Sequence, residues 1–277
     1  MSPAESTAAA SSAPASASSA KSPASGAHLH VRLVVAQKDG FALDVEFDAP
    51  PGITIFFGPS GSGKSTTLAA IAGLTTPTSG RIALGDEVWF DSAAKIDRPI
   101  HRRGVAFVFQ SLALFPHLTA ARNVAYGMDR ETPRGERRAR SLAMLERWKV
   151  GHLADRRPPT FSGGEAQRVA LARAFAMSPR IVLLDEPFSA MDRRLRYDLS
   201  AEVRSFVDEL QIPMIHVTHH RNEARALADR VVLLDRGRVI ATGPGSELLR
   251  DRPGTEDMSF DDTPMMMATR GAKGERP

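Results

Sequence analysis

The chain has 277 residues, enough for one large domain or two small ones, and its hydrophobic fraction of 42% allows a full core. The net charge of +4, from 36 Lys and Arg against 32 Asp and Glu, is too small to indicate a nucleic-acid partner. The absence of cysteine excludes disulfides, thiol catalysis and cysteine-ligated zinc or iron–sulfur sites. No apolar run reaches the ~18–20 residues needed to span a bilayer.

The two ends of the sequence differ in composition from its centre. Residues 1–27 are rich in Ala, Ser and Pro, which predicts a disordered tail and lacks the basic start of a secretory signal. Residues 253–277 are polar with Gly and Pro, which predicts a flexible C-terminal tail. We therefore expect one globular body over residues 28–252.

The globular part begins with two alternating segments, 28–36 and 41–47, which predict strands around a turn at Asp39–Gly40. Apolar runs of the buried-strand type follow at 52–57, 105–109, 181–185, 214–218 and 231–235. Helical patterns separate them at 64–74, 137–148 and 193–210. This alternation predicts an α/β fold of mostly parallel core sheet, with an N-terminal antiparallel part and helices on both faces. No convincing strand lies in 111–178, which we interpret as an inserted helical lobe.

A glycine-rich loop stands between the apolar run 52–57 and the first helical pattern. Its sequence, "GPSGSGKST", fits the phosphate-loop pattern G-x-x-x-x-G-K-[ST]. Glycines let backbone N–H groups turn toward phosphate oxygens, and the helix N-terminus adds partial positive charge. Lys64 is expected to reach the β- and γ-phosphates, and Ser65 to ligate Mg²⁺. The predicted nucleotide-binding residues are Gly58, Pro59, Ser60, Gly61, Ser62, Gly63, Lys64, Ser65 and Thr66.

Two acids end the buried run "IVLLDEP" (181–187). Open α/β sheets bind ligands beyond the carboxyl ends of their strands. There Asp185 is expected to hold Mg²⁺ through water, and Glu186 to accept a proton from a water attacking the γ-phosphate. Together with the phosphate loop, these acids predict a nucleotide-binding fold, but not yet a particular ATPase.

A second anion-binding turn lies about 20 residues before the acidic strand, in "FSGGEAQR" (161–168). Ser162 and Glu165 have the spacing of a capping box, which explains a helix start. It does not explain Gly163 and Gly164, because glycines lower helix stability. Their lack of side chains predicts the close approach of an anion to the backbone N–H groups.

This order of motifs resembles the ATP-binding subunits of ABC transporters, over roughly residues 29–250. "FSGGE" is similar to the signature LSGGQ of that family. The resemblance implies ATP and Mg²⁺ as cofactors, and two ATPase subunits paired head to tail. It also implies that Ser162, Gly163 and Gly164 close over the ATP bound to the partner's phosphate loop. The sequence departs from the family at Phe161, Glu165 and Met191, which stand for Leu, Gln and Leu.

The resemblance assigns roles to further residues. Gln110, at the end of "VFQ", matches the glutamine that contacts Mg²⁺ and the attacking water, and Asp192 matches the aspartate of the dimer-contacting loop. His219 matches the switch histidine, with His220 as a weaker rival, whereas His216 alternates inside its strand and is expected to be structural. No tyrosine occupies the usual adenine-stacking place; Phe41 is a candidate for it, with core packing as the alternative.

The stretch "HRRGVAFVFQSLALFPHLTAARNVAYGM" (101–128) is similar to importer ATPases, of which "FPHLT" is typical. Residues 86–110 and the SGGE form of the signature are most similar to molybdate-type ATPases. This implies uptake of a small anion through a membrane permease, with an extracytoplasmic solute-binding protein as an indirect partner. No nucleic-acid partner is expected. The location implied is peripheral, at the cytoplasmic face of the cell membrane. Phe115, Pro116 and His117 are candidates for the permease surface, with local packing as the alternative.

Two alternative hypotheses remain, one about the transported solute and one about the class of ATPase. Sulfate or another solute is the alternative cargo. A soluble ABC ATPase acting on ribosomes or DNA is the alternative class, although such proteins usually fuse two ATPase domains or insert coiled coils or cysteine modules. A P-loop kinase or GTPase would not need the FSGGE turn. The basic run 134–140 is interpreted as a solvated helix face rather than a lipid contact.

Overall fold

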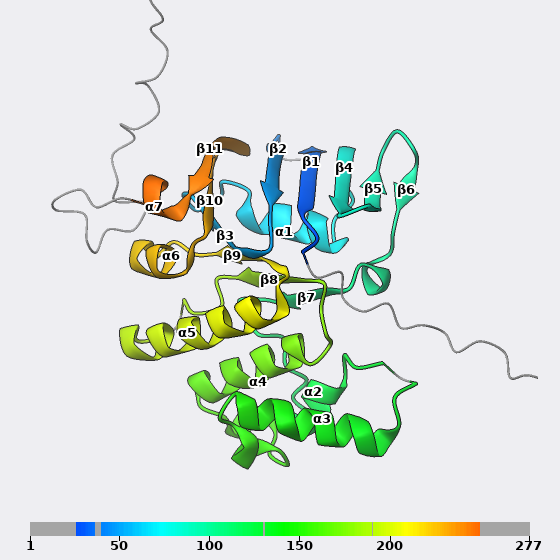
Figure 1. The fold of residues 1–277 in the computed structure, drawn as a ribbon, viewed down its shortest axis with the longest axis vertical. Helices are drawn as coiled ribbons and strands as arrows, with labels where there is room; N and C mark the ends of the chain where they lie inside the picture. Colours follow the sequence, from blue (N-terminus) through cyan, green and yellow to red (C-terminus); the bar gives the residue numbers. More distant parts are fainter. Residues whose placement is uncertain (1–25, 37–39, 130, 190, 250–277) are drawn as a thin grey trace, which may run out of the picture.

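The computed structural model of the chain describes residues 26–36, 40–129, 131–189 and 191–249. Its strands form one sheet of eleven strands in the order β6-β5-β4-β1-β2-β11-β10-β3-β9-β8-β7 (Figure 1). In chain order they are β1 (Leu29–Ala36), β2 (Ala42–Ala49), β3 (Gly52–Phe57), β4 (Ser79–Leu84), β5 (Glu87–Asp91), β6 (Ile96–Asp97), β7 (Val105–Val108), β8 (Ile181–Asp185), β9 (Pro213–Val217), β10 (Arg230–Asp235) and β11 (Arg238–Pro244).

The centre of the sheet is parallel. β3 pairs with both β9 and β10, β8 pairs with β9, and β7 pairs with β8, all in parallel. These strands are covered on both faces, which explains their nearly continuous apolar sequences. Because parallel strands point the same way, their carboxyl ends share one edge, where open α/β sheets bind ligands.

The other part of the sheet is antiparallel. β1 pairs with β2 and β4, and β5 pairs with β4 and β6. Buried and exposed residues alternate along β1 and β2, since only one of their faces meets the core. The predicted α/β fold, with a mostly parallel core and an N-terminal antiparallel part, is confirmed.

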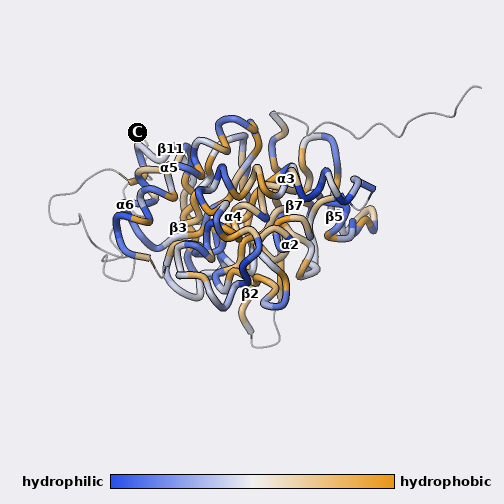
Figure 2. The backbone as a smooth tube through the Cα atoms, turned by 90° about the horizontal axis from the view of Figure 1, so that it is seen from below, coloured by the Kyte–Doolittle hydropathy of each residue, from blue (hydrophilic) through white to orange (hydrophobic). Residues whose placement is uncertain are grey.

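Helices cover both faces of the parallel strands. They are α1 (Lys64–Ala72), α2 (Ala120–Ala125), α3 (Arg134–Arg147), α4 (Gly163–Phe175), α5 (Arg193–Leu210), α6 (Arg221–Leu227) and α7 (Gly245–Leu248), with short 3₁₀ turns η1 (Ile100–Arg102), η2 (Gly151–Leu153) and η3 (Pro158–Thr160). Neighbouring strand residues face opposite layers: Phe56 packs with α1 and the antiparallel strands, whereas Ile55 and Phe57 join the core formed with α2–α6. Figure 2 shows the apolar residues concentrated on these central strands.

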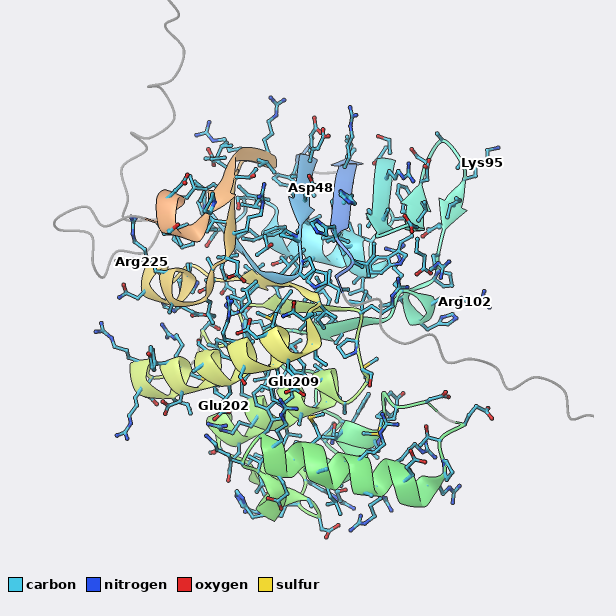
Figure 3. All side chains as sticks on the ribbon, viewed as in Figure 1. Asp48, Lys95, Arg102, Glu202, Glu209 and Arg225 are labelled. Carbon is cyan, nitrogen blue, oxygen red and sulfur yellow. The ribbon has the colours of Figure 1, made fainter. Side chains whose placement is uncertain are left out.

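The segment 111–178 carries α2, α3 and α4, and its described residues, all but 130, contain no strand. Figure 1 shows these helices at the end of the molecule opposite to β4–β6. Trp148 stacks on Phe206 of α5 with ring centroids 4.7 Å apart, and Arg147 pairs with Glu209. Glu202 of α5 also pairs with two basic side chains of this lobe. Figure 3 shows both labelled acids on the side of α5 that faces the lobe.

The sequence analysis does not predict β4, β5, β6 or β11. β11 fully buries none of its side chains, and β4 buries only its last three, so neither has a clear apolar pattern. Gly80 in β4 marks a close approach, because a Cβ there would lie 2.1 Å from the carbonyl oxygen of Arg32 in β1.

Some predictions fall outside the described residues. These are the tail at 253–277, all of the tail at 1–27 except Gly26 and Ala27, and Asp39 of the first turn. The backbone N–H of Gly26 donates to Gln211 O at 3.1 Å. None of the described helices is both long and apolar enough to cross a bilayer.

Candidate functional site

The phosphate loop lies between β3 and α1, at the carboxyl edge of the parallel strands. Gly63 has φ 100°, in the left-handed region, and α1 begins directly after it. The buried Lys64 donates from Nζ to the carbonyl oxygens of Gly58 and Pro59, both at 2.8 Å. A Cβ at Gly58 would lie 2.0 Å from Leu234 O, so the loop is pressed against β10. The backbone conformation at position 63 and the close approach at position 58 therefore both favour glycine.

The exposed start of α1 meets the acidic end of β8. The Ser65 hydroxyl donates to Asp185 Oδ1 at 3.0 Å, across 120 residues of sequence. Burial raises the pKa of Asp185, the hydrogen bond from Ser65 opposes this, and the charge of Glu186 raises it further. A hydroxyl and a carboxylate at this distance are hard oxygen donors, which fit Mg²⁺ bound jointly with phosphate oxygens and water.

The next residue, Glu186, faces a histidine that follows the adjacent strand β9. Glu186 has φ 46°, an uncommon conformation for a residue with a side chain, and its N–H donates to Val217 O at 3.1 Å. His219 Nδ1 lies 3.5 Å from Glu186 Oε2, and both side chains are partly exposed. Of the two histidines weighed from the sequence, His219 is therefore the one that pairs with Glu186. The ring of His220 lies 4.1 Å from that of His219.

Two further predicted residues lie close to this edge. Gln110 is exposed and follows β7, the neighbour of β8, so it leaves the sheet at the same edge as Asp185. Phe41 lies beside the phosphate loop: a Cβ at Gly63 would be 3.3 Å from Phe41 Cζ. The chain thus brings together the phosphate loop, Asp185, Glu186 and His219, with Phe41 next to the loop.

The loop after Gln110 is hydrogen-bonded to α4. Leu112 and Ala113 both have positive φ, 59° and 46°. Arg173 of α4 donates to the carbonyl oxygens of both residues at 2.7 Å. Its guanidinium carbon lies 5.7 Å from the ring centroid of Phe115, one of the residues predicted to meet a permease.

The predicted second anion-binding turn begins α4 with the expected capping box. The Ser162 hydroxyl accepts from Glu165 N–H at 3.3 Å, while Glu165 Oε2 accepts from Ser162 N–H at 2.7 Å and from its hydroxyl at 2.8 Å. A Cβ at Gly163 would meet nothing within 4 Å, whereas one at Gly164 would lie 2.7 Å from Leu195 Cδ2. The fold of the described chain therefore gives no reason for glycine at position 163.

Asp192 of the predicted dimer-contacting loop begins α5. Its Oδ1 accepts from Leu195 N–H at 3.0 Å, as an N-cap residue does. Because Leu195 also lies against Gly164, the starts of α4 and α5 are neighbours. The structure thus groups Ser162, Gly163, Gly164 and Asp192 at these two helix starts.

A buried polar cluster near the site is absent from the sequence analysis. It consists of His216, Thr218, Glu223 and Arg196. The signal available in the sequence was His216 itself, since a histidine inside a fully buried strand needs a polar partner. The sequence does not show that the partner is Glu223, on the following helix.

A phosphate loop between a central strand and a helix, with an acid at the end of a neighbouring strand, defines the P-loop class of nucleotide-binding proteins. The sequence profile of the ABC transporter family matches residues 43–189, just over half of the chain. The chain belongs to the ABC transporter family.

Curated relatives agree with this assignment. The chain is 44% identical over 228 residues to the molybdenum import ATP-binding protein ModC 1 of Azotobacter vinelandii, covering 82% of this chain and 62% of that protein. It is 45% identical over 211 residues to the ModC protein of Methylococcus capsulatus, covering 76% and 58%. The chain thus spans about 60% of the length of these relatives.

A solved structure has the same fold. The ATP-binding cassette MJ0796, in a dimeric post-hydrolysis state bound to ADP and Pi, is similar to this chain with a TM-score of 0.67 and 29% sequence identity. The match covers 81% of this chain and 100% of that one. A second solved dimer, described as a bacterial ABC transporter cassette, matches equally.

Proposed function

We propose that this chain is the ATP-hydrolysing subunit of an ABC importer. The observation that carries the proposal is that the phosphate loop and two acids meet at one edge of the sheet. Ser65 of the loop donates to Asp185, and Glu186 lies beside His219. Membership of the ABC transporter family supports it. These are the parts that phosphoryl transfer to water requires: a phosphate cradle, metal ligands and a base.

Each residue of the site has a role in this reaction. The phosphate loop and Lys64 bind the phosphates and offset their charge. Ser65, Asp185 and Gln110 would hold Mg²⁺, which supplies Lewis-acid neutralisation of the phosphate oxygens when bound. Glu186 accepts the proton of the attacking water, and His219 orients Glu186 and the γ-phosphate.

The complete site requires a second ATPase subunit. The unexplained glycine at position 163 supports this, because a Cβ there would meet nothing in the described chain. In a head-to-tail dimer, Ser162, Gly163 and Gly164 of one subunit approach the ATP on the other. Asp192 lies at the adjacent helix start and joins the same contact. The dimeric state of the solved cassettes supports the same arrangement.

The importer takes up molybdate, with sulfate or another small anion as the alternative. The names of the curated relatives support molybdate, although the chain spans only part of their length. The chain would act at the cytoplasmic face of the membrane, through a permease that contacts the region of Phe115, Pro116 and His117. A solute-binding protein would deliver the anion from outside.

Replacing Glu186 with Gln tests the ATPase. We expect Glu186→Gln to slow ATP hydrolysis by roughly 10²–10⁴-fold while ATP binding is kept, because the amide retains the shape of the acid but cannot accept the proton. Phosphate release and nucleotide affinity would be measured on the same preparation. Glu247→Gln, an exposed acid on α7, is the matched control. Unchanged turnover in Glu186→Gln would remove Glu186 as the base.

The importer assignment is tested by identifying the proteins that bind this chain in native membranes. Tagged Glu186→Gln protein with ATP would be recovered from detergent-solubilised native membranes, and the chains recovered with it identified by mass spectrometry. We expect a multi-span membrane protein. Molybdate and sulfate binding to the accompanying solute-binding protein would then distinguish the two cargoes. Recovery of ribosomal or DNA-repair proteins, with no membrane protein, would contradict the importer and leave the ATP site standing.

A further inference from the structure

A buried carboxylate on α6 lies behind the two histidines that follow β9. The side chain of Glu223 is 3% exposed, and Nε2 of the fully buried His216 lies 2.5 Å from its Oε1. The Thr218 hydroxyl donates to Glu223 Oε2 at 3.2 Å, and Arg196 Nε of α5 lies 3.9 Å from the same oxygen. The end of β9, the first turn of α5 and the first turn of α6 therefore meet at one carboxylate.

Two of these partners also hold the segments that form the candidate site. The Thr218 hydroxyl oxygen accepts from the backbone N–H of His220 at 3.1 Å, which fixes the chain on both sides of His219. Arg196 donates to the carbonyl oxygen of Met191 at 2.8 Å, the residue directly before Asp192. Glu223 is thus one side-chain contact away from the histidine segment (residues 217–220) and from the dimer-contact segment (residues 191–192).

Core packing does not account for a charged group at this place. An ionised carboxylate is costly to bury unless it is paired and hydrogen-bonded. Burial raises the pKa of Glu223, but His216 and then Arg196 lower it by more, so the acid ends below its ordinary range. On the other side of the cluster, the ring of Phe188 packs on His216 with centroids 5.6 Å apart. The carboxyl group of Glu223 is therefore offset by the basic side chains of His216 and Arg196, and it links β9, α5 and α6.

We propose that Glu223 is a positioning residue that keeps His219 in place relative to Glu186, without itself touching ATP. The inference rests on the proposed function, since it assigns Glu223 to the same reaction. The contact at stake is the 3.5 Å separation of His219 Nδ1 and Glu186 Oε2. Glu186 follows β8 and His219 follows β9, and the Glu223 cluster fixes the His219 side.

The test is a double-mutant cycle in the full chain. We expect Glu223→Gln to lower kcat for ATP hydrolysis roughly 10- to 100-fold, with KM changed by less than about twofold, because the site remains but its geometry loosens. In the His219→Ala background the same substitution should change the rate by less than about twofold, since its effect passes through His219. Single-turnover hydrolysis of radiolabelled ATP measures the slow variants.

A second measurement does not depend on activity. Hydrogen exchange followed by mass spectrometry should show faster exchange in Glu223→Gln over 217–222 and 191–195, with β1 unchanged. If Glu223→Gln does not fold, Thr218→Val removes only the hydroxyl that joins Glu223 to His220, and should show the same kinetic pattern. Glu87→Gln is the matched control, because Glu87 pairs with Arg98 and Arg180 in the antiparallel part of the sheet.

The outcomes separate the inference from the function beneath it. An equal loss of rate from Glu223→Gln in both backgrounds would overturn the positioning role, as would a loss of the same size in Glu87→Gln. If Glu186→Gln hydrolyses ATP as fast as the wild type, the proposed function is overturned, and the inference is overturned with it. If neither Glu223→Gln nor Thr218→Val changes the rate, the inference is overturned and the proposed function is not.

Discussion

At the scale of single residues, the lysine of the phosphate loop illustrates how the chain prepares a site for anions. Lys64 is buried, and its Nζ donates to two carbonyl oxygens of its own loop. An ammonium group held there offers its charge to phosphates that enter the loop.

We expect Lys64→Ala to weaken ATP binding about 10- to 100-fold, since hydrogen bonds to charged groups contribute about 1.5–3 kcal/mol. Titration calorimetry with ATP measures the change. Lys95→Ala, at the exposed turn between β5 and β6, is the control and should bind ATP as the wild type does. Equal affinities of Lys64→Ala and wild type would count against the phosphate-loop assignment.

The residues of the site differ in how far the sequence could predict them. Ser65 and Asp185 are 120 positions apart, yet their meeting could be predicted because Ser65 lies beyond the carboxyl end of β3, Asp185 ends β8, and parallel strands end at one edge. Glu223 could not, because the partners described above come from the end of β9 and from α5 rather than from its own helix. Side-chain meetings between elements depend on packing that a local pattern does not contain.

At the scale of elements, the start of α4 is held by a carboxylate that titrates at unusually low pH. The backbone N–H and then the hydroxyl of Ser162, with a smaller contribution from His152, lower the pKa of Glu165 to about 2. A lowered pKa in the folded state means that the stabilisation is complete above the unfolded pKa near 4.5 and is lost as pH falls toward 2.

Glu165→Gln should therefore lower the free energy of unfolding at pH 7, by about 1 kcal/mol or less because water reaches the side chain. The difference from the wild type should shrink as pH falls from about 5 toward about 2, the window set by the unfolded and folded pKa values. Urea unfolding at several pH values measures this difference. Glu136→Gln, in the first turn of α3 where no capping box exists, is the control. A difference that stays constant with pH would contradict the assigned role of the carboxylate.

The elements themselves were predictable where burial dictates sequence. The helix expected over 193–210 agrees with α5, and the apolar run 181–185 agrees with β8. β11 and β6 could not be predicted, because β11 lies half exposed and β6 has only two residues. Their strand conformation comes from pairing with neighbours, not from their own side chains.

At the scale of the whole molecule, the helical lobe is joined to the sheet through α4, which packs on β7, and through α5. Trp148 and Phe206 stack with ring planes 4° apart, and Arg147 lies over Phe206 at 3.6 Å from its centroid. The start of α5 carries Asp192, and α4 of the lobe starts beside it at Gly164. One helix thus connects the acidic strand, the helical lobe and the turn that we assign to a partner's ATP.

Gly163 distinguishes the requirements of folding from those of dimerisation. A Cβ there meets nothing within 4 Å, so Gly163→Val should change the free energy of unfolding by no more than about 0.5 kcal/mol. In a Glu186→Gln background, which retains ATP, the same change should weaken ATP-driven dimerisation at least about 10-fold, because the side chain enters the space of the partner's phosphates.

Light scattering after size-exclusion chromatography, with and without ATP, measures the dimer. Gly135→Val on α3 is the matched control, since a Cβ at Gly135 also meets nothing within 4 Å, and it should leave both stability and dimerisation unchanged. If Gly163→Val dimerises as its parent does, then the turn does not face a partner's nucleotide. The two glycines in "SGG" would then need an explanation within the single chain. The close approach of Leu195 explains Gly164, but no contact in the described chain explains Gly163.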